Sequence, residues 1–328
     1  MLHHPFKPVL SLLFCALSAA SSMAADRPPY PTDKITLVVP YSPGNGLDLL
    51  GREFAEALRQ QMHVPVIVEN RDGAAGVIGT QYVARAKPDG YTLLFTANPP
   101  FITSPLAMEK PSYDPVNAFT PIARVASAPL VLVVGTKYPI RNVAQLRDFA
   151  AKNPALASYA SAGIGSPGQI YGELLNQSIG VQLQEIRYKA TGQALMDVVA
   201  GNVLASLVSV SAALPHIKSG ALTALAVGSK ERLPALADVP TLAESLQSQD
   251  FEASVWYGVL APAGTSEERV AAIYEEVARA TNGKHIRAFM ERQFMVPAVI
   301  DSAGFARSMK TELQVSKKLV DQANLRAR

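Results

Sequence analysis

The chain contains little that could form a crosslink, bind a metal or make a basic surface. It has one cysteine, Cys15, so no internal disulfide can form. Its five histidines form no cluster with cysteine or carboxylate at metal-ligand spacing. The formal net charge is only +3, without a run of basic residues. We therefore expect no metal, no cofactor and no nucleic-acid partner. The single tryptophan, Trp256, lies with Tyr257 in an apolar segment, where core packing is the expected role.

Long apolar runs are also scarce. The N-terminal run, Val9–Ala20, is too short to span a bilayer, and no later segment is long and apolar enough. Lys7 precedes this run and Ser22-Met23-Ala24 follows it with small residues, the pattern of a secretory signal over residues 1–24. Cleavage removes one lysine, Cys15 and no acid, so the charge falls from +3 to +2 and no cysteine remains. We expect a periplasmic protein; a buried N-terminal helix or an uncleaved anchor is the alternative.

Short apolar strands alternate with amphipathic helices through the rest of the chain. Strands are predicted at 35–39, 64–69, 91–95, 129–134, 157–161, 181–188, 203–210, 222–227 and 255–260. Helices are predicted at 47–61, 77–87, 143–153, 168–177, 191–200, 212–219 and 266–282, with a final pair beyond Ser302. This alternation is typical of an α/β fold with mostly parallel sheets.

The length of the chain allows two lobes. Proline-rich loops near 99–121 and 229–240 are the expected places for the chain to pass between them. They divide the chain into a discontinuous first lobe, residues 25–125 and 229–328, and a second lobe, residues 126–228.

A glycine-rich turn follows the first predicted strand. Ile35–Val39 is β-branched and apolar, Pro40 ends the strand, and Pro43-Gly44-Asn45-Gly46 leads into a helix. A strand, such a turn and a helix N-terminus aim free backbone N–H groups at one point, which favours capture of a small anion. Asp48, in the first helical turn, could stabilise the helix dipole, contact a ligand or act as a general base.

A second glycine-rich segment, Gly163–Gly168, matches G-x-G-x-x-G between a strand and a helix. A dinucleotide site is disfavoured because no acidic residue closes the next strand: Glu185 lies inside it and Arg187 follows. The remaining interpretations are a tight turn that serves helix packing and capture of a small anion by Ser166 and backbone amides.

A hydrolase is the competing class. The nucleophile motif G-x-S-x-G fails at Ser166, because Ile164 takes the place of its first glycine. Only His63, His216 and His285 remain after cleavage of the signal, and none is placed near a candidate nucleophile by sequence. We predict no catalysis, with an exported α/β hydrolase-type enzyme as the alternative.

Several collinear segments of the mature chain resemble the extracytoplasmic solute receptors of tripartite tricarboxylate transporters, the Bug receptors. They are residues 30–41, 66–79, 86–94, 161–167 (S-A-G-I-G-S-P), 188–194 (Y-K-A-T-G-Q-A), 213–227 and 229–241 (S-K-E-R-L-P-A-L-A-D-V-P-T). The resemblance implies a two-lobed periplasmic binding protein of type II-like, Venus-flytrap form. It implies a receptor that binds a small organic acid between its lobes and delivers it to membrane transporter subunits. The alternative is a ligand sensor that presents the closed receptor to a membrane sensor kinase, and in either case we expect a monomer.

The resemblance also implies that backbone amides and small polar side chains hold the ligand carboxylate. In the first lobe the implied contacts are Tyr41, Pro43, Gly44, Asn45, Asp48, Thr96 and Asn98. In the second lobe they are Ser161, Gly163, Ser166, Thr191 and Ser209.

The chain departs from the family pattern in both lobes. Asn45 replaces a glycine, and Leu47 replaces a hydroxyl residue and so removes a polar contact. Val208-Ser209 stands where the family often has Asp-Asn. Because a buried ammonium group needs a charged partner, the lost carboxylate favours an organic acid without an amino group.

Overall fold

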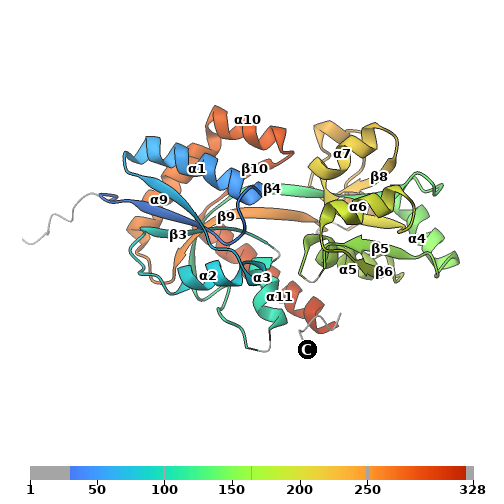
Figure 1. Ribbon diagram of the computed structural model, residues 1–328, viewed down its shortest axis with the longest axis horizontal. Helices are drawn as coiled ribbons and strands as arrows, with labels where there is room; N and C mark the ends of the chain where they lie inside the picture. Colours follow the sequence, from blue (N-terminus) through green and yellow to red (C-terminus); the bar gives the residue numbers. More distant parts are fainter. Residues whose placement is uncertain (1–29, 99, 109, 164, 249–250, 323–328) are drawn as a thin grey trace, which may run out of the picture.

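A computed structural model describes residues 30–98, 100–108, 110–163, 165–248 and 251–322. It shows two α/β lobes that are joined by strands (Figure 1). The predicted signal, residues 1–24, and Cys15 lie outside the described residues.

The two lobes are built from the following elements. The first contains β1 (Ile35–Val39), α1 (Gly46–Met62), β2 (Val66–Asn70), η1 (Ala74–Gly76), α2 (Val77–Ala84), β3 (Thr92–Ala97), α3 (Pro100–Ala107), β9 (Ser254–Pro262), α9 (Glu267–Asn282), α10 (Lys284–Arg292), β10 (Val296–Ile300) and α11 (Ser302–Gln322). The second contains α4 (Val143–Lys152), β5 (Ser158–Ser161), α5 (Pro167–Ile179), β6 (Gln184–Arg187), α6 (Thr191–Val199), β7 (Ala205–Ser209), α7 (Val210–Lys218), β8 (Leu222–Val227), η2 (Pro234–Leu236) and α8 (Leu242–Leu246). β4 (Phe119–Gly135) runs through both lobes.

The strands form one continuous sheet in the order β2-β1-β3-β9-β4-β7-β5-β6, and β8 and β10 also pair with β4. β1 is parallel to β2 and β3, and β5 is parallel to β6 and β7. Every pair that includes β4 or β9 is antiparallel. The predicted mostly parallel sheets are therefore mixed, because the strands that connect the lobes run against their neighbours.

β4 carries the chain from one lobe to the other within a single strand. Its residues up to Pro129 pair with β9, and those from Leu130 onward pair with β7 and β8. The prediction that the chain crosses in the loop near 99–121 is therefore wrong, and the strand predicted at 129–134 is only the end of β4. Proline cannot donate to a ladder, and the pairing of β4 with β9 shifts register next to Pro121.

The second crossing lies near the start of β9. Leu242 and Ala253 pack into the same cluster as Leu130 of the second lobe, and Leu233 packs with Val131. The predicted lobe boundaries at residues 126 and 228 stay a prediction; in the described residues, Leu233, Leu242 and Ala253 pack with the second lobe.

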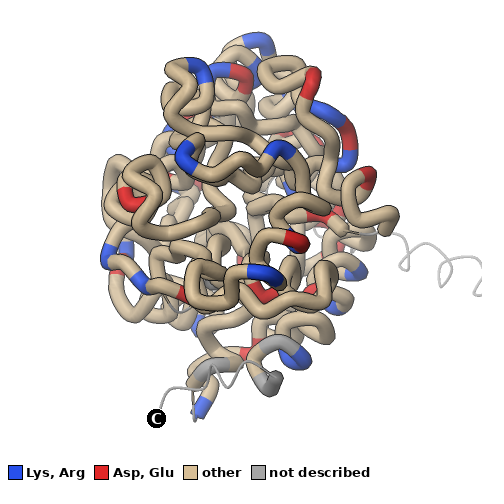
Figure 2. The backbone as a smooth tube through the Cα atoms, turned by 90° about the vertical axis from the view of Figure 1, so that its right-hand side faces the viewer, with Lys and Arg blue, Asp and Glu red and all other residues tan. Residues whose placement is uncertain are grey.

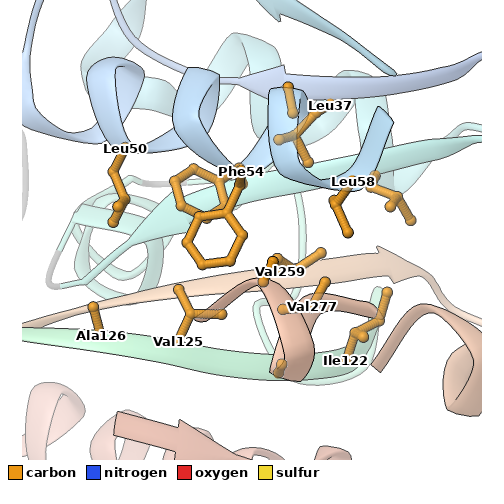
Figure 3. Close-up of a cluster of buried hydrophobic side chains, with 14 of the residues drawn as sticks. Leu37, Leu50, Phe54, Leu58, Ile122, Val125, Ala126, Val259 and Val277 are labelled. Atoms are coloured by element: carbon orange, nitrogen blue, oxygen red, sulfur yellow. The ribbon is translucent and has the colours of Figure 1, made fainter. Parts of the chain in front are cut away.

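The first-lobe core lies between α1 and the sheet. Leu50, Phe54 and Leu58 recur every four residues, so they share one face of α1 and are at most 1% exposed. They meet Val125 of β4 and Val259 of β9 (Figure 3). Truncating a fully buried phenylalanine costs about 3–5 kcal/mol, so this face fixes the position of α1 and of the turn before it.

The opposite face of the first-lobe sheet carries Trp256. Its ring meets Phe305 of α11 edge-on, with centroids 4.9 Å apart, and its side chain is buried. The predicted core role of Trp256 is confirmed, and Tyr257 packs partly buried against the core on the α1 side. The predicted final pair of helices is wrong in the part of the chain described, where one long helix, α11, follows Ser302.

Charges are mixed rather than grouped by sign. Lys and Arg alternate with Asp and Glu over the side seen in Figure 2. Within the described ranges, no helix combines the length and the apolar character that a bilayer span requires.

Candidate functional site

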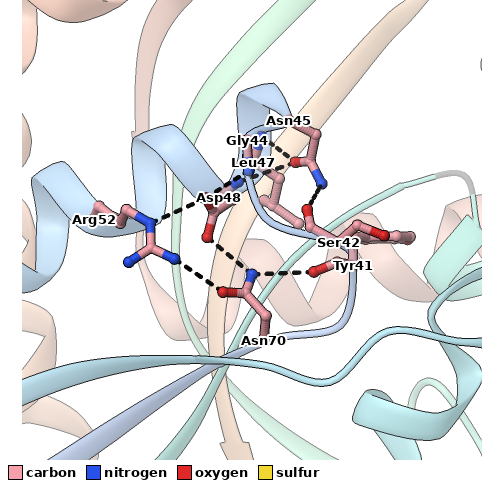
Figure 4. Close-up of polar contacts among 8 residues, drawn as sticks. All are labelled: Tyr41, Ser42, Gly44, Asn45, Leu47, Asp48, Arg52 and Asn70. Atoms are coloured by element: carbon pink, nitrogen blue, oxygen red, sulfur yellow. Dashed lines mark hydrogen bonds and ion pairs between the residues drawn. The ribbon is translucent and has the colours of Figure 1, made fainter.

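The turn between β1 and α1 is closed by its own side chains (Figure 4). Asn45 is the N-cap of α1: its Oδ1 accepts hydrogen bonds from the N–H groups of Leu47 (2.9 Å) and Asp48 (3.0 Å). Its Nδ2 donates to the carbonyl of Ser42 (2.7 Å). Asn45 has extended backbone angles, whereas Gly44 takes the left-handed conformation (φ +87°). Asn45 therefore caps the helix, and both polar atoms of its side chain are hydrogen-bonded within the turn.

Asp48 is 1% exposed, and its carboxylate also stabilises this turn. Its carboxylate accepts hydrogen bonds from the Gly44 N–H (2.9 Å), Arg52 Nε (3.0 Å) and Asn70 Nδ2 (2.8 Å). Burial acts to raise the pKa of Asp48, but the hydrogen bonds outweigh it and the pKa lies below its ordinary value. Of the roles left open by the sequence, local structure accounts for all of these contacts.

Leu47 points into the first-lobe core, where it is 5% exposed. The expectation that it removes a polar contact from the turn is therefore corrected: this position faces the core.

The other predicted first-lobe residues lie in different surroundings. Tyr41 is half-buried beside Gly76, and burial raises its pKa, so the phenol stays protonated and can donate. Pro43 is exposed on the turn. The Thr96 hydroxyl is buried and has no hydrogen-bond partner among the residues described.

Asn98 belongs to a separate network. Its Nδ2 donates to Glu312 Oε1 (2.6 Å), and its Oδ1 accepts from the backbone N–H of Trp256 (2.6 Å). Both ends of its amide are thus used to join β3, β9 and α11. Asn98 lines a cavity of about 540 Å³ between α5 and α11, which holds none of the other predicted contacts. Arg124 pairs there with Glu252 (3.6 Å), and burial raises the pKa of Glu312.

A smaller pocket of about 140 Å³ lies in the second lobe, against the connecting strands. Ser161, Ser166, Thr191 and Ser209, four of the five predicted second-lobe residues, line it. Gly163 is not in its lining but takes a left-handed conformation (φ +94°) in the turn beside it. The apolar part of the lining includes Leu130, Leu207, Val208 and Val255. The structure therefore brings together residues that are about 50 positions apart in sequence.

The helices that start at this pocket differ in how their first N–H groups are satisfied. Ser166 caps α5 by accepting from the Gln169 N–H (3.3 Å), and Ser209 caps α7 by accepting from the Ala212 N–H (3.4 Å). The N-cap of α6 is Ala190, which has no side-chain hydrogen bond to offer. The first N–H groups of α6 are therefore left open, with Thr191 on the pocket wall. Sequence reasoning named Thr191 but missed this feature; its signal is an alanine where a cap residue is expected.

The turn before α5 is fixed by a hydrogen-bond network that runs through Glu185. Ser161 Oγ donates to Glu185 (2.6 Å) and accepts from the Gly163 N–H (3.0 Å). Gln169, 0% exposed, accepts from the Gly165 N–H (2.8 Å) and donates to Glu185 (3.0 Å). Arg187 completes the network with a hydrogen bond to the same carboxylate (2.7 Å).

The lobes touch beside this turn. A Cβ atom on Gly165 would lie 3.6 Å from the hydroxyl of Thr103 in α3. Further along, Ile170 of α5 packs with Val320 of α11. The turn that carries Ser166 therefore lies next to the first lobe.

The histidines lie elsewhere. His63 ends α1, His216 lies in the last turn of α7, and His285 of α10 pairs with Glu53 (2.5 Å). None of the three lines the second-lobe pocket. Across the described part of the chain, no three His, Cys, Asp or Glu residues are grouped so that they could hold a metal ion.

Comparison with known proteins identifies the family. The tripartite tricarboxylate transporter family receptor matches residues 50–325. Protein BugT of Bordetella pertussis is 32% identical over 296 residues, which are 89% of each chain. The structure of Rpa4515 from R. palustris with adipate aligns with a TM-score of 0.74 at 29% identity, over 90% of this chain and 98% of that one. MatC from Rhodopseudomonas palustris with bound malate aligns with a TM-score of 0.71 at 26% identity, over 89% of this chain and 100% of that one.

These matches confirm the predicted two-lobed periplasmic binding-protein fold and the resemblance drawn from sequence. The chain belongs to the tripartite tricarboxylate transporter receptor family, a family of solute-binding receptors.

Proposed function

We propose that this protein is a periplasmic receptor that binds a small organic carboxylate between its lobes and delivers it to a tripartite tricarboxylate-type transporter. Family membership supports the receptor role, and two structural neighbours hold the carboxylates adipate and malate. We further propose that it acts as a monomer. The sensor-kinase alternative shares every ligand contact and differs only in the partner of the closed receptor.

The observation that carries the proposal is the uncapped N-terminus of α6 on the second-lobe pocket. Free N–H groups and the positive end of the helix dipole favour a carboxylate there. The hydroxyls of Ser166 and Ser209 accept from backbone N–H groups, so their own protons are available to the ligand. Two or three charge-assisted hydrogen bonds at about 1.5–3 kcal/mol each, with burial of the apolar part, suffice for the roughly 8 kcal/mol of a micromolar complex.

The first-lobe turn supplies the opposite wall in this proposal. The N-terminal end of α1 is the end that points towards the second lobe (Figure 1). The N–H groups of Gly44, Leu47 and Asp48 are taken by side chains, whereas those of Asn45 and Gly46 have no partner among the described residues. With the protonated hydroxyl of Tyr41 they are the first-lobe donors left for a ligand. Closure of the lobes would exclude water and strengthen each of these hydrogen bonds.

A ligand screen of the mature protein tests the proposal. The protein is refolded to remove ligand carried through purification, then melted with C4 and C6 dicarboxylates, citrate, aromatic monocarboxylates and amino acids. A ligand at one hundred times its Kd stabilises the fold by about 2.7 kcal/mol, a clear rise in melting temperature. Stabilisation by a carboxylate, lost when Ala190→Asp fills the N-terminus of α6, is the expected result. A panel without any stabilising carboxylate would contradict the receptor function.

A further inference from the structure

The helix α10 ends in a Schellman motif that carries phenylalanine where glycine is usual. The Phe294 N–H donates to the carbonyl of Glu291 (3.0 Å), and the Met295 N–H donates to the carbonyl of Met290 (2.8 Å). These two hydrogen bonds define the motif, which needs a left-handed residue directly after the helix. That residue is Phe294, with φ +55°. The end of α10 is therefore fully formed although it has no glycine at this position.

A bulky side chain is unfavourable in this conformation. The Cβ atom of an L-residue crowds the backbone when φ is positive, which is why glycine, and less often asparagine, takes this position in most helices. A Schellman motif is often accompanied by an apolar contact between the residue after the left-handed one and the end of the helix. Met295 supplies it, because it packs in the first-lobe cluster with Met290. The end of α10 by itself therefore gives no reason for an aromatic ring at position 294.

The side chain of Phe294 contacts the other lobe. It is half-buried and packs against the second-lobe cluster that contains Leu233 and Leu236. Residues of both lobes also line a groove of about 490 Å³ at this place. Leu233, Pro234 and Ala235 come from the second lobe, and Phe294 with its neighbours comes from the first. The strained backbone of Phe294 therefore occurs together with an apolar contact between the lobes.

The next residue connects this contact to the proposed ligand site. Met295 is 8% exposed and packs in the first-lobe core. A Cβ atom on Gly46 would lie 3.9 Å from the terminal methyl group of Met295. Gly46 belongs to the turn between β1 and α1, which supplies the first-lobe donors in the proposed function. Two consecutive residues, Phe294 and Met295, therefore contact the second lobe and the first-lobe turn.

We propose that Phe294 is a positioning residue that fixes the arrangement of the two lobes around the proposed ligand site. This inference rests on the proposed function and concerns how that site is assembled. A contact between the lobes narrows the range of lobe separations that the protein samples. Less conformational entropy is then lost when a ligand binds between the lobes. The strain at Phe294 is offset by this gain in preorganisation.

Distances between spin labels on the two lobes test this without any ligand. Cys15 lies in the predicted signal, so Gln60→Cys and Lys218→Cys introduce the only two thiols of the mature protein. Both positions are exposed, one on α1 and one in the last turn of α7. Double electron–electron resonance between the labels gives the distribution of lobe separations. Phe294→Gly should roughly double the width of this distribution or shift its mean by about 2 Å or more.

Two further variants assign the effect to the contact rather than to the strain. Phe294→Asn also suits the left-handed conformation and lacks an apolar ring, so it should change the distribution in the same way as Phe294→Gly. Both replacements favour the end of α10, so the helix is expected to form in each of them. His63→Gly is the matched control, because His63 ends α1 with φ +56° and is exposed. It relieves the same kind of strain and should leave the lobe separations unchanged.

The outcomes separate this inference from the proposed function. If both Phe294→Gly and Phe294→Asn keep the distribution of the parent, the inference is overturned and the receptor function stands. A change in His63→Gly as large as that in Phe294→Gly also overturns it, because relief of backbone strain would then be the cause. If no carboxylate of the ligand screen binds, the receptor function fails, whereas the label distances still decide whether Phe294 fixes the lobes.

Discussion

Two helices at the proposed site, α1 of the first lobe and α6 of the second, differ in how their first N–H groups are satisfied. In the first lobe Asn45 and Asp48 hydrogen-bond to the N–H groups of the turn itself, so this wall is set before any ligand arrives. In the second lobe the turn is fixed by Gln169, and the N-terminus of α6 is left without a cap. The difference teaches that the first N–H groups of a helix can be occupied by its own capping side chain, which fixes the turn, or stay open for a ligand. The following predictions test that contrast, from the largest expected effect to the smallest.

Removing the Asp48 carboxylate should remove the hydrogen bonds that fix the first-lobe turn and should destabilise the fold. Asp48→Ala leaves the Gly44 N–H, Asn70 and Arg52 without their shared acceptor, so we expect a loss of about 2–4 kcal/mol in the free energy of unfolding. Urea denaturation measures it. Glu56→Ala removes an exposed ion pair on the same helix and should leave the midpoint unchanged. An Asp48→Ala protein as stable as the parent would show that the turn does not depend on this network.

The Asp48 carboxylate should also make the free energy of unfolding depend on pH in the acid range. The pKa of Asp48 is lower in the folded protein than its ordinary value of 3.8, so its contribution to stability is present above that pH. It is lost as pH falls through the lower, folded pKa, because protonation then favours the unfolded chain. Denaturation at a series of pH values from 6 to about 2 should show a shallower acid loss in Asp48→Asn than in the parent. Equal slopes would contradict this assignment.

Capping α6 should occupy its first N–H groups, as Asn45 already does for α1. Ala190→Asp places a carboxylate on the open N–H groups, which should stabilise the fold by about 1 kcal/mol and weaken carboxylate binding at least roughly tenfold. Melting and calorimetry on the same sample measure the two changes. Ala190→Ser offers a neutral cap and should lie between the parent and Ala190→Asp in both. A stabilised variant with unchanged affinity would place the ligand carboxylate away from α6.

The smallest effect is expected from the cap of α5. Ser166→Ala should cost about 1 kcal/mol of stability and weaken the ligand a few-fold, since the serine serves both the helix and the proposed site. Ser266→Ala removes the corresponding cap of α9, outside the pocket, and provides the matched comparison. It should lose similar stability and keep its affinity. Equal affinities in the two variants would assign Ser166 to helix capping alone.

The sequence by itself determined the local units. A β-branched strand, a glycine turn and an amphipathic helix are coded within about 25 residues, so β1 with α1 and β5 with α5 were predicted with bounds close to those observed. Four of the five second-lobe residues named from family motifs meet at one pocket for the same reason, because each ends a strand or begins a helix.

What only the tertiary structure decided are the properties that depend on a partner far away in the chain. β4 continues through Pro121 because β9, more than 100 residues later, supplies the pairing that local sequence does not indicate. Asn98 is hydrogen-bonded to Glu312, and Leu47 packs into the first-lobe core. Whether a serine donates or accepts was likewise fixed by residues such as Glu185, which approach it only after folding. Sequence patterns report local periodicity and caps, whereas burial and hydrogen-bond direction belong to the assembled neighbours.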